Sequence, residues 1–264
     1  MNIKNGRITM RRPDDMHVHL RDGILLDQLL RHTAEVFGRG LIMPNLTQAV
    51  TTMELMLAYR RLIREKLDIF QFHGFEPLMT IQITEATTPE MVIEARQAGA
   101  VAGKFYPKGM TTNAENGVWN YAATNPALEA MQECGMVACF HGESPDPQVN
   151  PRDREHKFLD TLLQISKRYE KLRIVMEHIT DASSVRWVLG LPNVAATITV
   201  HHLLITETAW CGGKLRPHLF CKPMPKTFKD RDTLIQAALS GNPKFFLGTD
   251  SAPHPRHLKE CVDD

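Results

Sequence analysis

The sequence predicts an α/β protein, a (β/α)8 barrel of the TIM type. Eight short apolar runs alternate with segments of helical period, a pattern typical of parallel strands joined by helical crossovers. An open doubly wound sheet fits this alternation nearly as well. However, no G-x-G-x-x-G motif follows the first strand, which disfavours the dinucleotide-binding version of that sheet. No short repeat or low-complexity linker divides residues 1–264, so we expect a single domain.

The predicted strands are short runs rich in aliphatic and aromatic residues. In chain order they cover residues 15–20, 40–46, 78–84, 101–107, 136–143, 173–179, 195–203 and 244–251. Between them, apolar residues recur at steps of three and four, which predicts helices. In chain order these cover residues 25–37, 51–67, 88–99, 125–135, 151–170, 181–190 and 229–241. The glycine- and proline-containing segment 205–229 is expected to form an elaborated loop.

Composition restricts the class of protein. Hydrophobic residues make up 43% and charged residues 23% of the chain, as in ordinary globular proteins, and the formal net charge is +1. This charge gives no reason to expect a nucleic-acid partner, and no apolar run reaches the ~20 residues that span a bilayer. No secretory signal is recognisable at the start. Five cysteines without CxxC spacing are expected to be reduced thiols in a cytoplasmic protein; these are Cys134, Cys139, Cys211, Cys221 and Cys261.

Polar side chains recur where the predicted strands end. Because barrel chemistry takes place at the carboxyl ends of the strands, we expect these residues to surround one site. In chain order they are His17, His19, Arg21, Asn45, Lys104, His141, Glu143, His178, His201, His202 and Asp250. His17 and His19 share one face of a strand and could chelate a metal, although an isolated H-x-H is also compatible with two hydrogen-bonded histidines.

Imidazole and carboxylate ligands suit zinc without excluding other divalent ions. The set is larger than one catalytic zinc needs, so two metals are the simpler arrangement. Two adjacent cations require an anion between them, and a desolvated lysine such as Lys104 can become a carbamate. Alternatively, Lys104 extends to solvent or pairs with Glu143. Glu143 is expected to support a ligand, and His201 or His202 to be a buried, hydrogen-bonded histidine.

Several motifs together resemble the shorter, bacterial-type branch of the dihydroorotases, within the amidohydrolase superfamily. They are DDMHVHLRDG, MPNL, GKFYP followed by TTN, FHGE, EHIT, HHL, RPHLFCKP and LGTDSAPH, spread over residues 14–254. The resemblance implies a zinc enzyme of pyrimidine (UMP) biosynthesis that interconverts N-carbamoyl-L-aspartate and L-dihydroorotate. It also implies a cytoplasmic homodimer that acts on a small molecule, with no nucleic-acid or membrane partner.

The resemblance implies a role for each matched residue. His17, His19, Asp250 and carboxylated Lys104 hold one zinc, and Lys104, His141 and His178 hold the other, with Asp250 as the proton-transferring group. Substrate contacts fall to Arg21, Asn45, His141, His254 and the backbone at Lys222 and Ala252. Only a main-chain role carries over for Lys222, because some relatives have leucine there. Thr111 and Thr112 match a mobile loop that closes over the substrate, and without the resemblance they read equally well as an ordinary polar turn.

Family members continue beyond the sequence APHPRHLKE, whereas this chain ends at CVDD. We therefore expect a barrel that lacks the part after strand eight, with the outer face of residues 244–248 uncovered. Two other functions are compatible with this type of barrel. A hydantoinase or allantoinase is disfavoured by Arg21 and Asn45, because hydantoins lack the carboxylate. A non-catalytic assembly scaffold is disfavoured because all six metal-ligand positions are kept.

Overall fold

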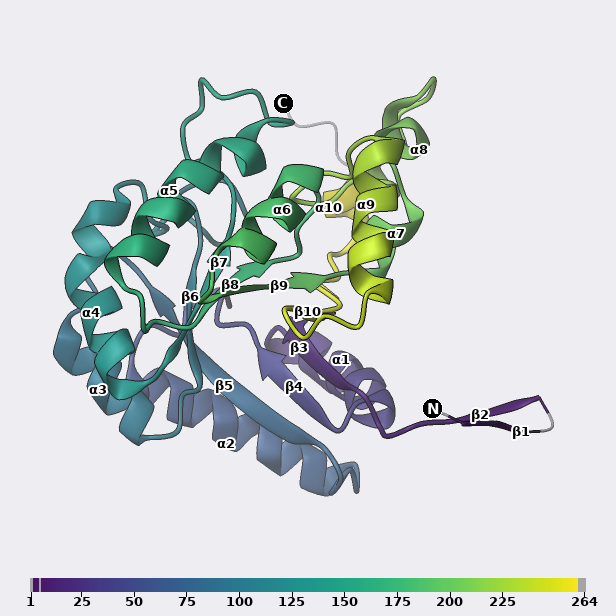
Figure 1. The fold of residues 1–264 in the computed structure, drawn as a ribbon. Coiled ribbons are helices and arrows are strands. Elements are labelled where there is room, and N and C mark those ends of the chain that lie inside the picture. Colours follow the sequence, from purple (N-terminus) through teal and green to yellow (C-terminus); the bar gives the residue numbers. More distant parts are fainter. Residues whose placement is uncertain (1, 5, 261–264) are drawn as a thin grey trace.

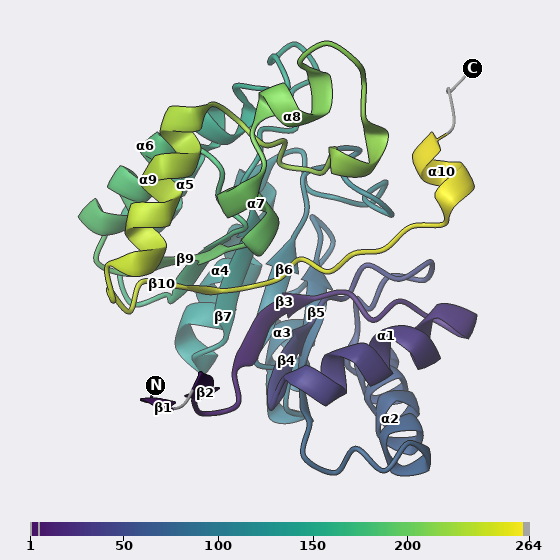
Figure 2. The same cartoon turned by 90° about the vertical axis from the view of Figure 1, so that its right-hand side faces the viewer.

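The computed structural model describes residues 2–4 and 6–260, and it is a nearly closed barrel of eight parallel strands surrounded by helices (Figures 1 and 2). Neighbouring barrel strands are consecutive in the chain, as predicted. They are β3 (Asp14–Val18), β4 (Arg39–Ile42), β5 (Glu76–Ile83), β6 (Ala102–Phe105), β7 (Val137–His141), β8 (Ile174–Glu177), β9 (Val194–Ile198) and β10 (Phe245–Leu247).

The seven predicted helices are present on the outside of the barrel. They are α1 (Gly23–Val36), α2 (Met53–Ile69), α3 (Pro89–Gln97), α4 (Asn125–Cys134), α5 (Arg154–Arg168), α6 (Ala182–Gly190) and α9 (Phe228–Leu239). Their starts follow the sequence signals: the Thr88 hydroxyl accepts from the Met91 amide ahead of Pro89, and Gly135 ends α4 in the left-handed conformation. Among the described residues, no helix is long and apolar enough to cross a membrane.

The structure adds short elements that the sequence did not predict. A hairpin of β1 (Asn2–Lys4) and β2 (Arg7–Thr9) projects from the barrel (Figure 1). The expected loop 205–229 contains α8 (Glu207–Cys211) and a 3-10 turn, η2 (Pro217–Leu219), and another 3-10 turn, η1 (Tyr121–Thr124), precedes α4. After β10, the chain forms the short helix α10 (Arg256–Glu260).

Several strands end earlier than predicted: β4 ends at Ile42 rather than at residue 46, and β10 ends at Leu247 rather than at residue 251. The seventh strand was expected to reach residue 203 and to carry His201 and His202, but β9 ends at Ile198 and both histidines lie on helix α7 (Val200–Leu204). Thr199 starts this helix, because its hydroxyl accepts a hydrogen bond from the His202 amide at 3.1 Å. A short apolar run such as VHHLL has no periodicity that separates strand from helix.

The ring is closed by contacts between the first and the last barrel strands, which lie side by side in Figure 2. An isolated parallel bridge joins Val18 to Ser251, and both the amide and the hydroxyl of Thr249 donate to the Asp15 carboxylate. Gly248 permits this approach, because a Cβ there would lie 2.8 Å from the Cβ of His17. The closure brings the end of β10 beside the histidines of β3.

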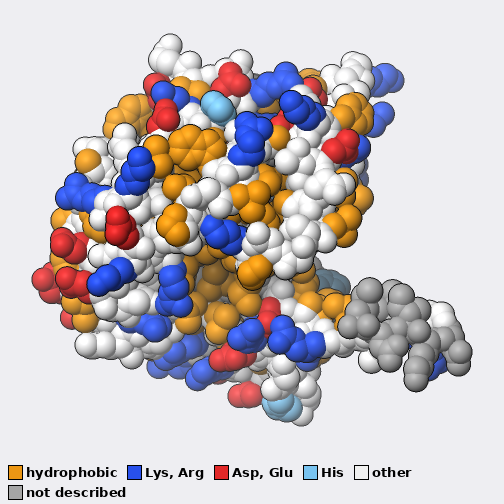
Figure 3. All heavy atoms as spheres, viewed as in Figure 1, with side chains coloured by type: hydrophobic (Ala, Val, Ile, Leu, Met, Phe, Trp, Pro, Cys, Tyr) orange, Lys and Arg blue, Asp and Glu red, His pale blue; other side chains and the backbone are white. Residues whose placement is uncertain are grey.

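The interior of the barrel and its outer layer differ in character. A small cluster fills the interior with Leu41, Met43, Ala102 and Cys139, and the large core lies between strands and helices. Residues Phe245–Leu247 of β10 stay partly exposed, unlike those of the central strands. Charges of both signs are scattered over the face seen in Figure 3. The described cysteines Cys134, Cys139, Cys211 and Cys221 are free thiols, while Cys261 lies outside the described residues.

Candidate active site

A cavity of about 480 Å³ opens at the carboxyl ends of the barrel strands. It is lined by all the predicted site residues except Lys104, Glu143 and His202, which are buried and do not line it. The lining comprises His17, His19, Arg21, Asn45, Tyr106, Thr111, Thr112, His141, His178, His201, Phe220, Cys221, Lys222, Asp250, Ala252, His254, Leu258 and Lys259. Residues far apart in the chain therefore surround one space, in the part of the fold where barrel enzymes carry their chemistry.

Three ligand-type atoms converge on the wall formed by β3 and the end of β10. The Nε2 atoms of His17 and His19 are 3.3 Å apart, and Oδ1 of Asp250 lies 3.4 Å and 3.1 Å from them, respectively. Burial lowers the pKa of His19 to about 4, against the opposing effect of Asp250. His19 is therefore neutral near pH 7 and can offer a nitrogen lone pair.

The outer contacts of both rings favour a proton on Nδ1. His19 Nδ1 lies 2.7 Å from Oδ1 of Asn45, which can only accept a hydrogen bond. His17 Nδ1 lies 2.9 Å from Oε2 of Glu177. Protons on these nitrogens leave the lone pairs of both Nε2 atoms facing Asp250. Three electron-pair donors with no proton between them repel one another unless a cation lies there, so this geometry fits a metal ion.

Lys104 lies on the floor of the site. Its Nζ is buried without a hydrogen-bond partner, 5.2 Å from the centre of the Tyr106 ring, and burial lowers its pKa. Strand register puts Gln82 beside Lys104 on one side and Cys139 on the other. Both polar side-chain atoms of Gln82 also lack partners. A buried amine without a hydrogen-bond partner is costly to keep charged, so this environment favours the neutral amine.

His141 and His178 line the same cavity, and the His178 ring centre lies 4.9 Å from that of His17. The ring centres of His141 and His178 are 4.6 Å apart, and Nδ1 of His178 is buried without a hydrogen-bond partner. Burial lowers the pKa of His178 well below its usual value, and the nearby His141 lowers it further. Oε2 of Glu143 lies 2.6 Å from Nε2 of His141. Glu143 is thus positioned to support His141, while His178 keeps a free nitrogen.

The mouth of the cavity carries groups suited to a carboxylate. Nη2 of Arg21 lies 3.4 Å from Nε2 of His254, and the Asn45 amide donates to the carbonyl of Thr112 at 3.2 Å. Lys222 Nζ donates to the carbonyl of Met110 at 2.7 Å. These two bonds tie the loop containing Thr111 and Thr112 to the rim of the cavity.

Backbone strain is concentrated in the same place. Arg21, His178 and Asp250 have positive φ angles of 57°, 41° and 49°, a region that non-glycine residues rarely adopt. Such conformations persist only where surrounding contacts hold them, and they often mark functional sites. For Asp250, its amide donates to the carbonyl of His17 at 2.9 Å, which is one such contact.

Some residues of the site were not predicted. Glu177 lies on β8 against His17, Gln82 lies beside Lys104, and Tyr106 lines the cavity. Glu177 could have been noticed as a charge inside the apolar run RIVMEHI, and Gln82 as an amide inside LMTIQIT. Tyr106 gives no such signal, because tyrosine is common in strands.

The barrel and its ring of histidines define an enzyme of the amidohydrolase superfamily. The dihydroorotase of Azoarcus sp. is 47% identical over 97% of this chain and 74% of its own length. The crystal structure of the Campylobacter jejuni dihydroorotase matches 93% of this chain and 71% of its own, with 37% identity and a TM-score of 0.86. That of Saccharomyces cerevisiae, in complex with 5-fluoroorotic acid, matches 95% and 72%, with 32% identity and a TM-score of 0.88. No protein-family model matches. The chain belongs to the dihydroorotase family, hydrolases that act on a cyclic amide.

Proposed function

We propose that the protein interconverts N-carbamoyl-L-aspartate and L-dihydroorotate in pyrimidine (UMP) biosynthesis, with two zinc ions. The observation that carries the proposal is the convergence of His17, His19 and Asp250, whose ligand atoms lie within 4.8 Å of one another at the wall of the cavity. The dihydroorotase names of its relatives support the choice of substrate. Guanidinium and imidazole groups at the mouth suit the carboxylates of that substrate.

The buried donors divide into two sets. His17, His19, Asp250 and carboxylated Lys104 would hold one zinc, and His141, His178 and the same carboxylated Lys104 would hold the other. When bound, the two cations supply Lewis acidity that polarises the ring carbonyl and makes water a stronger acid. The free Nδ1 of buried His178 supports this assignment, because an unpartnered buried nitrogen is costly unless something binds it.

The carbamate arises from Lys104 itself. Neutral Nζ adds to the carbon of carbon dioxide, a C–N bond forms, and one proton leaves to solvent. The amine becomes an anion that can bridge two cations. The partnerless Nζ and its lowered pKa support this step, because only the uncharged amine is a nucleophile.

Asp250 is the proposed proton carrier. Burial alone would raise the pKa of its carboxyl, but the surrounding imidazoles of His19, His17 and His178 lower it well below its usual value. The carboxylate can accept a proton from the attacking water and deliver it to the ring nitrogen as the amide bond breaks. Ring closure follows the same path in reverse.

The remaining residues bind and enclose the substrate. Arg21, Asn45 and His254 would bind its carboxylate, with Arg21 offering two parallel donors. His141 and the backbone at Lys222 and Ala252 would contact the ring. Thr111 and Thr112 would close over it and exclude water.

The test combines metal analysis with a choice of substrates. We expect about two zinc ions per chain and turnover of dihydroorotate, with no turnover of hydantoin or allantoin, because those rings lack the carboxylate that Arg21 binds. His17→Ala should lose metal, whereas the control His73→Ala should not, since His73 is exposed and outside the site. Turnover of hydantoin alone would identify a different cyclic-amide hydrolase, and a protein without metal or turnover would support a scaffold.

We propose that the enzyme works as a cytoplasmic homodimer. The free thiols of Cys134, Cys139, Cys211 and Cys221 are compatible with a reducing compartment. Light scattering on the purified protein measures the assembly directly, and a mass of one chain at assay concentration would contradict the dimer.

A further inference from the structure

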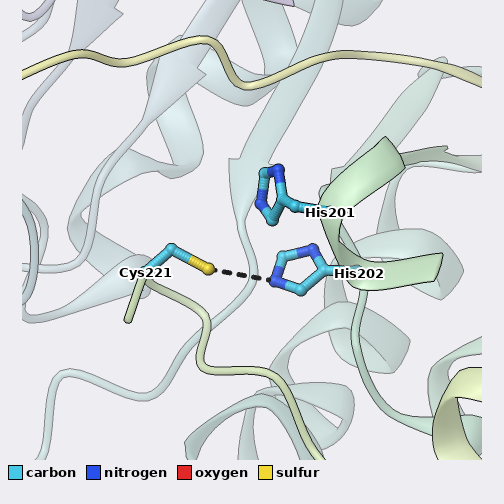
Figure 4. A group of neighbouring side chains, drawn as sticks. All are labelled: His201, His202 and Cys221. Carbon is cyan, nitrogen blue, oxygen red and sulfur yellow. Dashed lines mark hydrogen bonds between the residues drawn. The ribbon is translucent and has the colours of Figure 1, made fainter. Parts of the chain in front are cut away.

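A second group of metal-ligand side chains lies beside the cavity, outside the sets assigned above. His201 and His202 come from α7, and Cys221 comes from the segment after η2 (Figure 4). One ligand atom from each residue lies within 4.8 Å of the others. His201 and Cys221 line the cavity, whereas His202 is buried behind them.

The side chains point toward one another. The thiol of Cys221 reaches toward the His202 ring, with Sγ 3.4 Å from Nε2, and the His201 ring lies next to both (Figure 4). The two ring centres are 4.4 Å apart. Nε2 of His201 is buried without a hydrogen-bond partner. An unpartnered buried nitrogen next to a thiol is an unusual arrangement in a core, because each such atom loses hydration without compensation.

Both imidazoles are suited to bind a cation. Burial lowers the pKa of His202 to about 3, and it also lowers the pKa of His201. Both rings are therefore neutral near pH 7, the form that binds metals. Nδ1 of His202 lies 2.8 Å from the Thr199 hydroxyl, which can accept its proton and leave the Nε2 lone pair directed at Cys221.

We propose that His201, His202 and Cys221 bind one further Zn²⁺ ion at the wall of the cavity. Two imidazoles and a thiolate match the ligand preference of zinc, and the cavity supplies water for a fourth position. On binding, the S–H bond breaks, the proton leaves to solvent and sulfur donates its electron pair to the metal. Because the thiol must lose its proton, the site should fill more completely as pH rises.

Such an ion would hold the segment that contains Cys221 against helix α7 at the wall of the cavity. Cys221 precedes Lys222, whose side chain holds the carbonyl of Met110 in the loop over the site. A metal bond from Cys221 to α7 would fix the position of this segment. Zinc in excess of the two ions proposed for the active site would then change how easily the loop containing Thr111 and Thr112 opens. The third ion would regulate the enzyme rather than take part in the chemistry.

The alternative is a hydrogen-bonded cluster without a metal. Nε2 of His202 also lies 3.0 Å from the carbonyl of Pro223, so a proton on that nitrogen would satisfy both groups. The thiol would then only pack against the ring. The two arrangements differ in one measurable property, because only the metal site contains a metal–sulfur bond.

Cobalt(II) is the probe that separates them. We expect the whole protein, titrated with Co²⁺, to develop a sulfur-to-cobalt charge-transfer absorption in the near ultraviolet. The ligands proposed for the metal pair are nitrogen and oxygen, so they cannot produce it, and the result is independent of whether dihydroorotate is turned over. Cys221→Ser and His201→Gln should lose the band. Cys211→Ser should keep it, because Cys211 is an exposed thiol on α8.

Zinc competition and thiol protection provide two further tests of the proposed site. Competition by Zn²⁺ should abolish the cobalt band, and zinc-saturated protein should protect Cys221 from a thiol reagent. A wild-type protein without the band, or a Cys221→Ser protein that retains it, would overturn the proposal. Circular dichroism of each variant verifies that a lost band is not a lost fold, and His201→Gln provides a test that leaves the thiol in place.

Discussion

Nδ1 of His17 lies 2.9 Å from Oε2 of Glu177, and both side chains are buried beneath the cavity. The same oxygen accepts a hydrogen bond from the Thr197 hydroxyl at 2.6 Å. Burial alone would raise the pKa of Glu177, but the contact with His17 and the hydrogen bond from Thr197 lower it, so the carboxylate stays ionised. A fixed negative charge behind the ring keeps its proton on Nδ1 and directs Nε2 toward the cavity.

Replacing the Glu177 carboxylate should weaken metal binding without creating a cavity in the core. Glu177→Gln keeps the size of the side chain but removes the charge, so we expect metal affinity to fall by about 10- to 100-fold. Competition with a metal chelator measures the change. Glu76→Gln, an exposed residue at the opposite end of the barrel strands, should leave the affinity unaltered. Equal affinities in the two variants would show that His17 needs no partner.

Arg21→Met should affect substrate binding rather than metal content. Loss of a charge-assisted pair with a carboxylate costs about 1.5–3 kcal/mol, so KM should rise steeply while zinc stays bound. Steady-state kinetics with dihydroorotate and metal analysis check both halves. The exposed Arg39, which pairs with Asp14, offers the matched control Arg39→Met. Unchanged kinetics for Arg21→Met would remove this residue from the site.

Asp250→Asn should separate metal binding from turnover. The amide still presents an oxygen to a cation, but it cannot carry a proton, so activity should collapse more than metal content does. Zinc content and kcat measured on the same preparation give the comparison. Activity within a few-fold of the wild type would assign proton transfer to another group.

Lys104→Arg is the critical substitution for the carbamate. Guanidinium cannot be carboxylated and would repel cations, so we expect loss of bound zinc and of nearly all activity. Lys104→Ala should behave similarly, and small added carboxylic acids should restore part of its activity by filling the vacated space. An active Lys104→Arg protein with two zincs would end the carbamate hypothesis.

Stability should depend on a buried ion pair away from the cavity. Lys226 Nζ donates to Oε2 of Glu155 at 2.8 Å, and although burial opposes ionisation, this lysine helps lower the pKa of Glu155 to about 2. The lowered pKa stabilises the fold fully above the ordinary value of 4.5, and that contribution is lost as pH falls toward 2. Glu155→Gln should therefore destabilise the protein by about 3–5 kcal/mol at pH 7.

Urea unfolding at pH 7 and at pH 3 measures this effect. The difference between wild type and Glu155→Gln should shrink at the lower pH, where Glu155 loses part of its advantage. Asp27→Asn breaks the partly exposed pair with Lys66 and should change stability by less than about 1 kcal/mol. A pH-independent difference for Glu155→Gln would mean that packing, rather than charge, is responsible.

Much of the fold could be predicted because the hydrophobic periodicity and the residues that start or end helices are properties of short sequence segments. Thr88 with Pro89 and Gly135 specify helix ends through their own backbone preferences. His201 and His202 were misplaced because their short run lacks a period, and the hydroxyl of Thr199 decides in favour of a helix. The hairpin of β1 and β2 was missed although its Asn-Gly sequence is a hairpin signal.

From the sequence, site residues could be predicted only where a chemically active residue type lies at the end of a predicted strand. His17, His19 and Asp250 were predicted from their positions on the predicted strands. Glu177 was not, because its role depends on an inward-facing neighbour from a different strand. The positive φ angles of His178 and Asp250 also have no sequence signature, since glycine is the residue that usually marks such positions.

The closure of the barrel determines when the site can exist during synthesis. Asp15 and Thr249, which join the first and last strands, are 234 residues apart. Contacts of such long range are slow to form, because the chain must lose its loop entropy before they stabilise anything. Until residue 251 has left the ribosome, β3 has one edge without its partner, and exposed edges favour aggregation. Strand β3, which carries His17, is thus the first barrel strand to be made and among the last to gain both of its neighbours.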